Sequence, residues 1–390
     1  MNTTRFKSVS VYLFIVLFTS GYLYSQSVQP SNREETLGPE NGTLLIIGGS
    51  ASDMFYHKFM ELVGGPEAPI VVIPTAASSN TLSEAFLARF KKRYLDIGFK
   101  NVTVLHTRDP KEANSDEFIK PIKTAKGVWF SGGRQWRHAD SYLNTKTHDA
   151  FNELLDRGGV VAGSSAGATI QGSYLARGDT KRNTIMMGDH EVGLGFLTNV
   201  AIDQHLLARN RQFDMFEILD HKPELLGIGI DENTGIIVRH DRFEVIGESY
   251  VAMYDNTRWS AERDTVYQLS KGSREYYMLK SGDEYNLKKR EVITPKNREY
   301  VSLSNDQLQQ YVGTYKADDD SIKIEITKVD KGLTMKTNQG EFALLPTSQD
   351  RFYFSNSNSF LTFKMNTDGS VAKIVIPNQN MTLSKTSGNN

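Results

Sequence analysis

Residues 163–167, with the sequence GSSAG, have the composition and spacing of a serine nucleophile. They fit the pattern G-x-S-x-G and lie between the strand-like run 159–162 and a segment with helical character. A tight strand-to-helix turn of this kind projects the hydroxyl of the central serine, Ser165, out of the sheet, and small neighbours let the backbone pass close to other backbone. A structural turn or a phosphate-binding loop would use similar residues. The position directly after a buried strand favours acyl transfer by Ser165.

Acyl transfer also needs backbone N–H groups that stabilise a negatively charged oxygen. In the predicted turn, the amide of Ala166 follows the serine and is suitably placed for this role. A glycine turn at 132–133 ends another apolar run, and the amide of Gly133 is the second predicted donor. The sequence therefore predicts an oxyanion site formed by Gly133 and Ala166.

A serine nucleophile needs a general base, and histidine is the side chain that titrates near neutral pH. The chain has eight histidines. His205 ends the segment IDQH after an apolar run, so it occupies a strand end, whereas the other histidines lie in polar, helical or loop contexts. A structural role is the alternative for a histidine at such a position. His205 is the best candidate for the base.

These residues require a sheet that brings strand ends together. Apolar runs at 44–47, 70–73, 102–105, 127–130 and 159–162 alternate with helical segments. Such a pattern predicts an α/β fold with a doubly wound, mostly parallel sheet that is covered on both faces. Ligands of such sheets bind beyond the carboxyl ends of the strands, where this chain is rich in Gly, Ser and Thr.

The later part of the chain has a different pattern. Runs at 226–230 and 234–238 predict further strands, and 243–254 predicts a hairpin. Beyond residue 295, short segments with period-two alternation and turn residues between them predict a small antiparallel β domain over 296–390.

Composition narrows the classes of function. A chain of 390 residues with 39% hydrophobic and 23% charged residues indicates a globular protein of more than one domain. The net charge of −1 argues against a nucleic-acid partner. Because cysteine is absent, disulfides, cysteine nucleophiles, thiolate metal sites and a lipoprotein anchor are excluded. No histidine pair has metal-ligand spacing, and the glycine segments at 48–50 and 64–66 lack the spacing of dinucleotide or P-loop motifs, so neither a metal nor a cofactor is predicted.

The N-terminus has the order of a secretory signal peptide. Arg5 and Lys7 precede an apolar run at 9–18, and small and polar residues follow up to Ser25. The apolar run is shorter than the ~20 residues that a membrane-spanning helix needs. We expect a signal peptide over 1–25, a polar linker over 26–40, and an exported mature protein, periplasmic or extracellular, without a stable membrane anchor.

Four segments in order carry a resemblance to a known family: SGGRQ at 131–135, GSSAGA at 163–168, IDQH at 202–205 and GIDENT at 229–234. Together they resemble the serine peptidase family of cyanophycinase and dipeptidase E. The likeness covers residues 42 to 251 and implies a flavodoxin-like α/β domain over 41–290, related to class I glutamine amidotransferases, with serine in place of their cysteine.

The resemblance implies catalytic roles for particular residues. Ser165 would be the nucleophile and His205 the general base, with no cofactor. The acid that orients the histidine has two candidates. Asp179 lies between the serine and the histidine in sequence, as in relatives of dipeptidase E, and Glu232 lies at the end of a later predicted strand. Either residue could instead fix a turn.

The resemblance also implies a substrate, because cyanophycinases release β-aspartyl-arginine dipeptides from the polymer cyanophycin. The positions that match their substrate-binding residues are Gln135, Asp203, Gln204, Arg209 and Arg211. A guanidinium could clamp a substrate carboxylate, and a carboxylate could receive the substrate arginine. A solvated helix face is the alternative for the two arginines. Where a further arginine is expected, the chain has Asp214. This difference bears on whether cyanophycin is the substrate and leaves the prediction of serine hydrolysis unchanged.

Two alternatives therefore remain: an exported peptidase for other acidic or isoaspartyl peptides, and a non-catalytic exported peptide-binding protein. The resemblance is also compatible with a homodimer. Residues 310–315, QYVGTY, resemble the start of a small β domain found after secreted β-lactamase-like hydrolases, which would give this segment a role in packing, dimerisation or partner binding.

Overall fold

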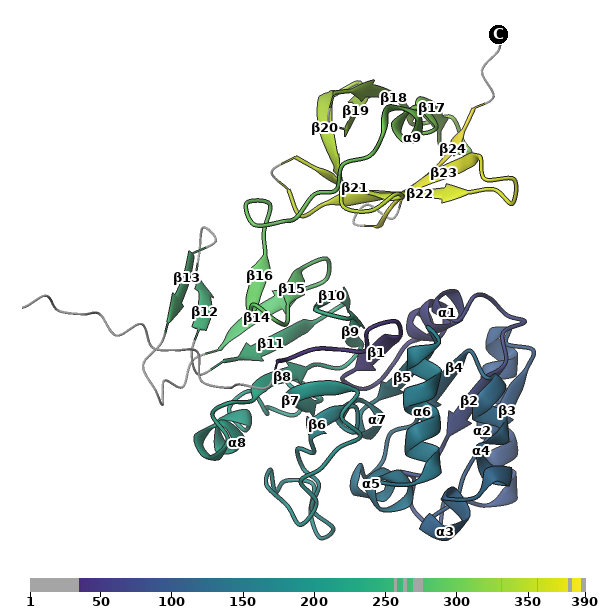
Figure 1. Cartoon of the computed structure of the whole chain (residues 1–390), viewed down its shortest axis with the longest axis vertical. Helices are drawn as coiled ribbons and strands as arrows, with labels where there is room; N and C mark the ends of the chain where they lie inside the picture. Colours follow the sequence, from purple (N-terminus) through teal and green to yellow (C-terminus); the bar gives the residue numbers. More distant parts are fainter. Residues whose placement is uncertain are drawn as a thin grey trace, which may run out of the picture. The chain divides into compact units, whose positions relative to one another are not determined.

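A computed structural model (Figure 1) describes residues 35–255, 258–261, 265–268, 276–330, 332–355, 357–377 and 381–386. The predicted signal peptide, 1–25, lies outside these residues, as does most of the predicted linker. Among the helices of the described ranges, none is long and apolar enough to cross a membrane.

The elements alternate in the first half of the chain and are almost all strands in the second. The helices are α1 Asp53–Leu62, α2 Glu84–Ile97, α3 Pro110–Ala113, α4 Asp116–Thr124, α5 Trp136–Tyr142, α6 Lys146–Asp156, α7 Ala166–Thr169, α8 Met215–His221 and α9 Asn305–Gln309. The strands up to residue 293 are β1 Thr43–Ile47, β2 Ile70–Ile73, β3 Val102–Val104, β4 Gly127–Phe130, β5 Val160–Ser164, β6 Gly172–Tyr174, β7 Leu197–Gln204, β8 Leu226–Ile230, β9 Thr234–Arg239, β10 Arg242–Gly247, β11 Tyr250–Tyr254, β12 Arg258–Ala261, β13 Thr265–Gln268, β14 Tyr277–Lys280, β15 Glu284–Asn286 and β16 Glu291–Ile293.

A nine-stranded sheet has the order β16-β15-β10-β9-β1-β5-β4-β2-β3. The strands β1, β5, β4, β2 and β3 run parallel, and β9 pairs antiparallel with β1. The five parallel strands coincide with the apolar runs identified in the sequence, so the prediction of an α/β fold with a mostly parallel sheet is confirmed.

Both faces of this sheet are covered, which explains why its strands are continuously apolar. On β1, Leu44 and Ile46 belong to a buried cluster with residues of α4 and α6. Leu45 and Ile47 point to the opposite face and belong to a cluster with residues of α1 and α2. The helices flank the parallel strands in Figure 1.

A second sheet, which the sequence did not distinguish from the first, has the order β14-β11-β8-β7-β6. Its strands β6, β7 and β8 run parallel. Ile202 and Ile228 belong to the same buried cluster as Leu44. One face of the second sheet therefore packs against this cluster, which covers the face of the first sheet that Leu44 lines. Residues of α8 contribute to the cluster on its other side.

The predicted hairpin over 243–254 is wrong. Both strands form, but β10 pairs with β9 and β15, whereas β11 pairs with β8 and β14. The chain passes from one sheet to the other between Gly247 and Tyr250, beside the turn in which β8 passes to β9. Backbone N–H groups of Glu248 and Ser249 bond to Asn233 and Thr234 of that turn, so the connection is fixed by this neighbour.

The C-terminal part is a closed antiparallel barrel, which confirms the predicted small β domain. Its strands are β17 Gly313–Lys316, β18 Lys323–Val329, β19 Gly332–Thr337, β20 Gly340–Pro346, β21 Arg351–Phe354, β22 Phe360–Met365, β23 Val371–Ile376 and β24 Met381–Lys385. The helix α9 begins after Ser304, which forms a capping box with Gln307, and contributes Leu308 to the barrel core.

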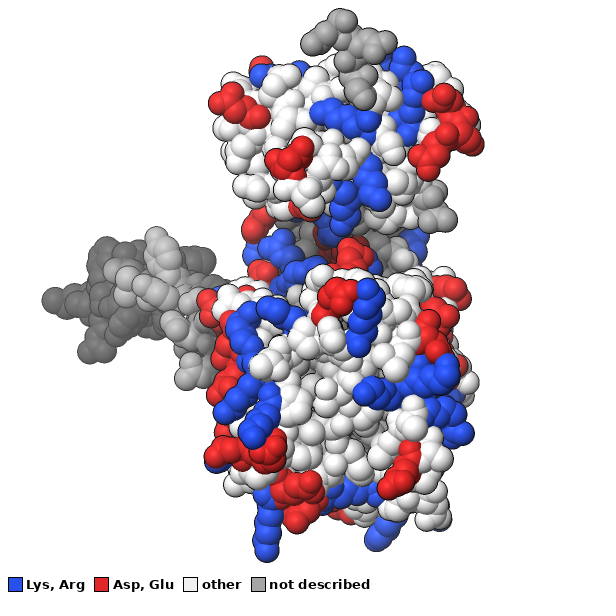
Figure 2. Space-filling view, turned by 90° about the vertical axis from the view of Figure 1, so that its right-hand side faces the viewer, with Lys and Arg blue, Asp and Glu red and all other residues white. Residues whose placement is uncertain are grey.

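Acidic and basic side chains are interspersed on the face of the protein drawn in Figure 2, in keeping with the net charge of −1.

Candidate active site

Ser165 occupies a strained strand-to-helix turn between β5 and α7. Its backbone angles are φ 59° and ψ −116°, a conformation that non-glycine residues rarely adopt. The glycines on both sides are required by close approach. A Cβ on Gly163 would lie 2.1 Å from the Gly167 carbonyl oxygen, and one on Gly167 would lie 2.2 Å from that of Phe130. The local geometry is therefore that of the G-x-S-x-G turn predicted from the sequence.

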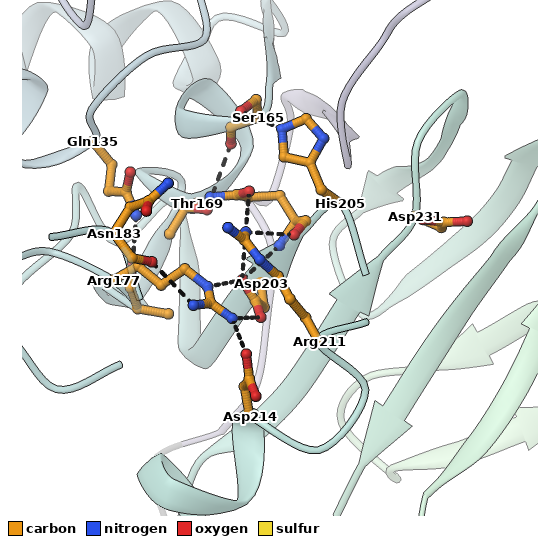
Figure 3. A network of polar contacts seen from close by, with 12 residues as sticks. Gln135, Ser165, Thr169, Arg177, Asn183, Asp203, His205, Arg211, Asp214 and Asp231 are labelled. Carbon is orange, nitrogen blue, oxygen red and sulfur yellow. Dashed lines mark hydrogen bonds and ion pairs between the residues drawn. The ribbon is translucent and has the colours of Figure 1, made fainter. Parts of the chain in front are cut away.

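His205 and Glu232 continue from this serine as a chain of hydrogen bonds. The Ser165 Oγ lies 2.8 Å from His205 Nε2, and His205 Nδ1 lies 2.6 Å from Glu232 Oε1. The histidine follows β7 and the glutamate follows β8, so both come from the second sheet, whereas the serine comes from the first. Figure 3 shows Ser165 and His205 facing each other.

The end of β1 holds all three positions through its backbone. The Ile47 carbonyl accepts from the Ser165 N–H at 3.0 Å, and the Gly48 carbonyl accepts from the His205 N–H at 3.0 Å. The next carbonyl, of Gly49, accepts from the N–H of Asn233, the neighbour of Glu232, at 2.8 Å. Three consecutive carbonyl groups thus set the spacing of the serine, the histidine and the glutamate.

Gly49 also makes room for the imidazole. A Cβ at this position would lie 2.2 Å from Cε1 and 2.4 Å from Nδ1 of His205. Gly49 was not among the residues predicted for the site, although the sequence shows glycines at the end of this strand. Only the neighbouring ring, which comes from 156 residues later in the chain, explains the requirement, and the sequence did not reveal that contact.

The environment favours neutral His205 and ionised Glu232. Burial lowers the pKa of His205, and the positive charges of Arg209 and Arg211 lower it further, while the hydrogen bond to Glu232 opposes this. Hydrogen bonds from the Ser50 side chain and from His205 lower the pKa of Glu232. With Glu232 accepting from Nδ1–H, the unprotonated Nε2 faces the serine hydroxyl.

The two predicted oxyanion donors flank the serine. Ala166 is the first residue of α7, and Gly132 precedes Gly133 in the turn after β4. Gly132 is close to the nucleophile, because a Cβ on it would lie 3.2 Å from Ser165 Cβ. In the described part of the chain, neither the Gly133 N–H nor the Ala166 N–H has an acceptor. Both amides are therefore available to a ligand.

Asp179, the other candidate for the orienting acid, is used differently. Its Oδ1 accepts from the backbone N–H groups of Lys181 and Arg182, each at 2.8 Å, and so closes a turn. Its backbone carbonyl accepts from the Arg134 side chain. Of the two candidates, Glu232 is the one that the structure brings to His205.

The predicted substrate-binding residues fall into two groups. Gln135, Asp203, Gln204 and Arg211 are buried, whereas Arg209 is exposed. The Gln135 amide donates to the Ala176 carbonyl at 2.8 Å. Arg211 donates to Gln204 Oε1 at 2.7 Å, and burial together with the charge of Arg177 lowers the pKa of Arg211 to about 10. The buried residues therefore bond mainly to protein groups.

Arg177, which the sequence analysis missed, is central to this buried group (Figure 3). Its guanidinium donates to both Asp203 oxygens, at 2.7 and 2.9 Å, and to Asp214 at 2.5 Å. Burial alone would lower the pKa of Arg177, but the hydrogen bonds and charges of Asp203 and Asp214 raise it. Asp214, where an arginine was expected, is thus a partner of Arg177. The one signal in the sequence was the departure at 214, where an acidic residue stands in place of the expected arginine.

Hydroxyl, imidazole and carboxylate joined in this order, with the serine on a strand-turn-helix, are the arrangement of a serine hydrolase. The family model described as peptidase family S51 matches residues 44–246. The chain therefore belongs to peptidase family S51 and is a serine-type peptidase. A second family model, a domain of unknown function (DUF3471), matches residues 297–389.

Two curated relatives are cyanophycinases. The cyanophycinase of Geminocystis herdmanii is 28% identical over 261 residues, which cover 63% of this chain and 94% of the relative. That of Trichormus variabilis is 26% identical over 275 residues, which cover 65% of this chain and 89% of the relative. A crystal structure of a peptidase from an acI-B1 actinobacterium aligns with a TM-score of 0.45 and 23% identity over 65% of this chain and 98% of that chain.

Proposed function

We propose that the protein is an exported serine exopeptidase of cyanophycinase type that acts through an acyl-enzyme. The observation that carries this proposal is the continuous hydrogen-bonded chain in which Ser165 Oγ lies 2.8 Å from His205 Nε2 and His205 Nδ1 lies 2.6 Å from Glu232. This proposal assigns the role of orienting acid to Glu232 and a turn-forming role to Asp179.

In the proposed reaction, Ser165 Oγ attacks the scissile carbonyl carbon while His205 Nε2 accepts the hydroxyl proton. The oxygen of the tetrahedral intermediate accepts hydrogen bonds from the Gly133 and Ala166 amides. Collapse of the intermediate breaks the C–N bond, and His205 gives its proton to the leaving amine. Water then attacks the acyl-enzyme, with His205 again as the base. Glu232 stabilises the imidazolium in both steps.

We propose β-aspartyl-arginine units, in a polymer or in peptides, as the substrate. Support comes from the two relatives named as cyanophycinases and from Arg209, an exposed guanidinium four residues after the proposed base. A second candidate is another acidic or isoaspartyl peptide. The observation that favours it is Asp214, which stands where a cyanophycinase-type site was expected to have an arginine and which binds Arg177.

We also propose that the protein is exported. The basic, apolar and small residues of 1–25 support this assignment. Expression of the full chain with a C-terminal tag, followed by fractionation and N-terminal sequencing, tests it. A processed N-terminus near residue 25 in the exported fraction is expected, and an unprocessed cytosolic protein would contradict it.

The catalytic proposal is tested with the mature chain from residue 26. Purified protein and its Ser165→Ala variant are incubated with cyanophycin, and released dipeptide is measured by mass spectrometry. We expect release by the parent alone, with a loss of about 10⁴-fold or more in the variant. Activity retained by folded Ser165→Ala would contradict the assignment of the nucleophile.

A serine-directed phosphonate distinguishes the remaining outcomes, because only an activated serine reacts with it. Labelling of Ser165 without release from cyanophycin would favour the other acidic or isoaspartyl peptides, which are then compared directly. No labelling and no release would favour a non-catalytic peptide-binding protein.

A further inference from the structure

Three arginines, Arg108, Arg134 and Arg137, gather around the loop that follows β2. Arg108 Nη2 donates to the Thr75 carbonyl at 3.1 Å and also to that of Ala77. Arg137 Nη1 donates to the Ala76 carbonyl, between these two, at 2.8 Å. We call Arg108, Arg134 and Arg137 the arginine cluster. Because neighbouring carbonyls hold Arg108 and Arg137, their guanidinium groups lie close together.

Arg134 joins the cluster through the same loop. Its backbone N–H donates to the Ala76 carbonyl at 3.0 Å, and its side chain donates to the backbone carbonyl of Asp179. After burial, the charges of Arg108 and then Arg134 lower the pKa of Arg137, as expected when like charges are neighbours.

The cluster has no counter-ion within the described ranges. None of its three guanidinium groups forms an ion pair with a described carboxylate. Glu112, an acidic residue close to Arg108 in sequence, accepts from the Thr107 hydroxyl at 2.6 Å instead. Arg177 provides the contrast, because its charge is balanced by Asp203 and Asp214. Backbone carbonyls hold the arginine cluster in place but leave its positive charge uncompensated.

Hydrogen-bond donors are also in excess at this position. The Nε atoms of Arg108 and Arg134 are buried without a partner among the described residues. Arg137 uses one Nη for the loop, and its guanidinium lies 5.1 Å from the centre of the Trp136 ring, whereas a guanidinium carries five N–H groups. Arg134 and Arg137 are only partly buried, so donors remain accessible to a ligand.

The cluster lies beside the proposed reaction centre. Gly132, against Ser165, begins the segment 132–137 that carries Arg134 and Arg137. Arg134 is only two residues after Gly132, so their Cα atoms are at most about 7.6 Å apart, and one or two residues of an extended peptide, at about 3.5 Å each, span a similar distance. Arg209 belongs instead to the segment after the proposed base.

We propose that the arginine cluster is a subsite for a free carboxylate of the peptide substrate, one or two residues from the scissile bond. This inference rests on the proposed function and adds a substrate class to it, namely peptides that carry a terminal or side-chain carboxylate at that distance. A carboxylate supplies the missing charge and accepts the planar N–H pairs of a guanidinium in bidentate form. The subsite selects for the carboxylate over the neutral amide of the same shape.

The test uses two phosphonates that react with Ser165 and differ in one group. One carries a carboxylate at the distance of a neighbouring residue, and the other carries a carboxamide there. The second-order rate of inactivation is measured for each, and the ratio of the two rates is the readout. We expect a ratio of tenfold or more for the parent protein. The ratio should approach one in Arg137→Gln and fall in Arg134→Gln, and Arg137→Lys should retain part of it.

Arg157→Gln is the matched control, because Arg157 also donates to backbone carbonyls, of Ile122 and Ala125, but lies at the end of α6. It should keep the ratio of the parent. Equal rates with both phosphonates in the parent, or an unchanged ratio in both Arg137→Gln and Arg134→Gln, would overturn the subsite while leaving the serine peptidase intact. If neither phosphonate labels Ser165, the proposed function fails and the subsite fails with it.

Discussion

The strand ends of the α/β part and the core of the barrel have opposite compositions. Around the site, Arg177, Asp203, His205 and Arg211 are all buried. Among the described residues of the barrel strands, no charged side chain is buried, and the core consists of aromatic and aliphatic residues such as Phe363. Burying a charge is costly unless it is paired and hydrogen-bonded, so the barrel follows the general rule and the site departs from it.

The backbones differ in the same way. Ser50, Ser165, Arg177 and His205 have positive φ near the site, whereas Asp320 is the sole non-glycine case among the described residues of the barrel. Residues in sparsely populated conformations persist only where the surroundings hold them. The α/β part thus places buried charges and strained backbone at the positions that bear chemistry, whereas the barrel strands bury no charge and are built from locally favourable choices.

The largest difference between the two regions is expected when one charged side chain is removed from each of them. Arg177→Met leaves the fully buried Asp203 with Arg211 at 3.7 Å as its remaining cation, so we expect a loss of about 3–5 kcal/mol in the free energy of unfolding. Lys336→Met in the barrel removes an ion pair with Glu341 that is exposed to solvent, so it should leave the free energy of unfolding nearly unchanged. Urea denaturation followed by circular dichroism measures both. Equal losses would contradict the contrast between the regions.

Two glycines with similar backbone angles provide a second comparison. Gly49 has φ 151° and Gly340 has φ 144°, but only the Cβ of Gly49→Ala would collide with a neighbour, the His205 ring. Because small misplacements of a catalytic group are costly, we expect kcat to fall by about 100-fold in Gly49→Ala. Gly340→Ala, with nothing within 4 Å of the added carbon, should leave kcat unchanged. A normal kcat for Gly49→Ala would show that His205 tolerates the displacement.

The charges around His205 predict a shift in pH dependence. Neutral His205 is the active base, so kcat/KM should fall as the pH decreases through the pKa of His205, which lies below its usual 6.5. Arg209 lowers this pKa, so Arg209→Gln should raise it and move the acid limb to higher pH, by about one unit or less. Arg209→Lys should leave the limb in place. Profiles of kcat/KM against pH measure the position of the acid limb. A shift of this limb to lower pH in Arg209→Gln would contradict the predicted direction.

A modest loss of stability without a loss of activity is expected in the barrel core. The buried Tyr315 hydroxyl donates to the Tyr311 carbonyl at 2.7 Å, so Tyr315→Phe should cost about 1 kcal/mol in the free energy of unfolding. The peptidase rate should not change, because this tyrosine lies in the barrel core. A decrease in kcat/KM at full folding would mean that the barrel contributes to catalysis and that the two regions are not independent.

Much of the fold could be predicted because period and composition are local properties. The parallel strands of the first sheet appear as continuous apolar runs, and most barrel strands appear as alternating segments between turn residues. The division into two sheets was not predicted, since β10 and β11 read as a hairpin until the neighbouring turn at Asn233 is known. Long-range pairing decided this element, and no local pattern expressed it.

The sequence predicted those site residues that belong to a recognisable motif. The sequence brought Ser165, His205 and Glu232 into consideration, but it also offered Asp179, and the spatial arrangement depends on contacts between two sheets. Arg177 and the arginine cluster were missed for a related reason. An isolated arginine in a sequence carries no sign of whether its partners are carboxylates, as for Arg177, or backbone carbonyls, as for Arg137.

The carbonyl groups at the end of β1 have a consequence for changes in chain length. The carbonyl groups of three consecutive residues, Ile47, Gly48 and Gly49, accept from the N–H groups of Ser165, His205 and Asn233. Every amino acid carries such a carbonyl group, so the spacing does not depend on the side chains. A substitution at Ile47 that keeps the strand buried leaves this spacing intact, whereas an insertion or deletion of a single residue at 47–49 shifts two of the three segments relative to the third. The site therefore tolerates a conservative replacement of Ile47 better than the gain or loss of one residue at 47–49, whereas Gly48 and Gly49 are also required for close approach.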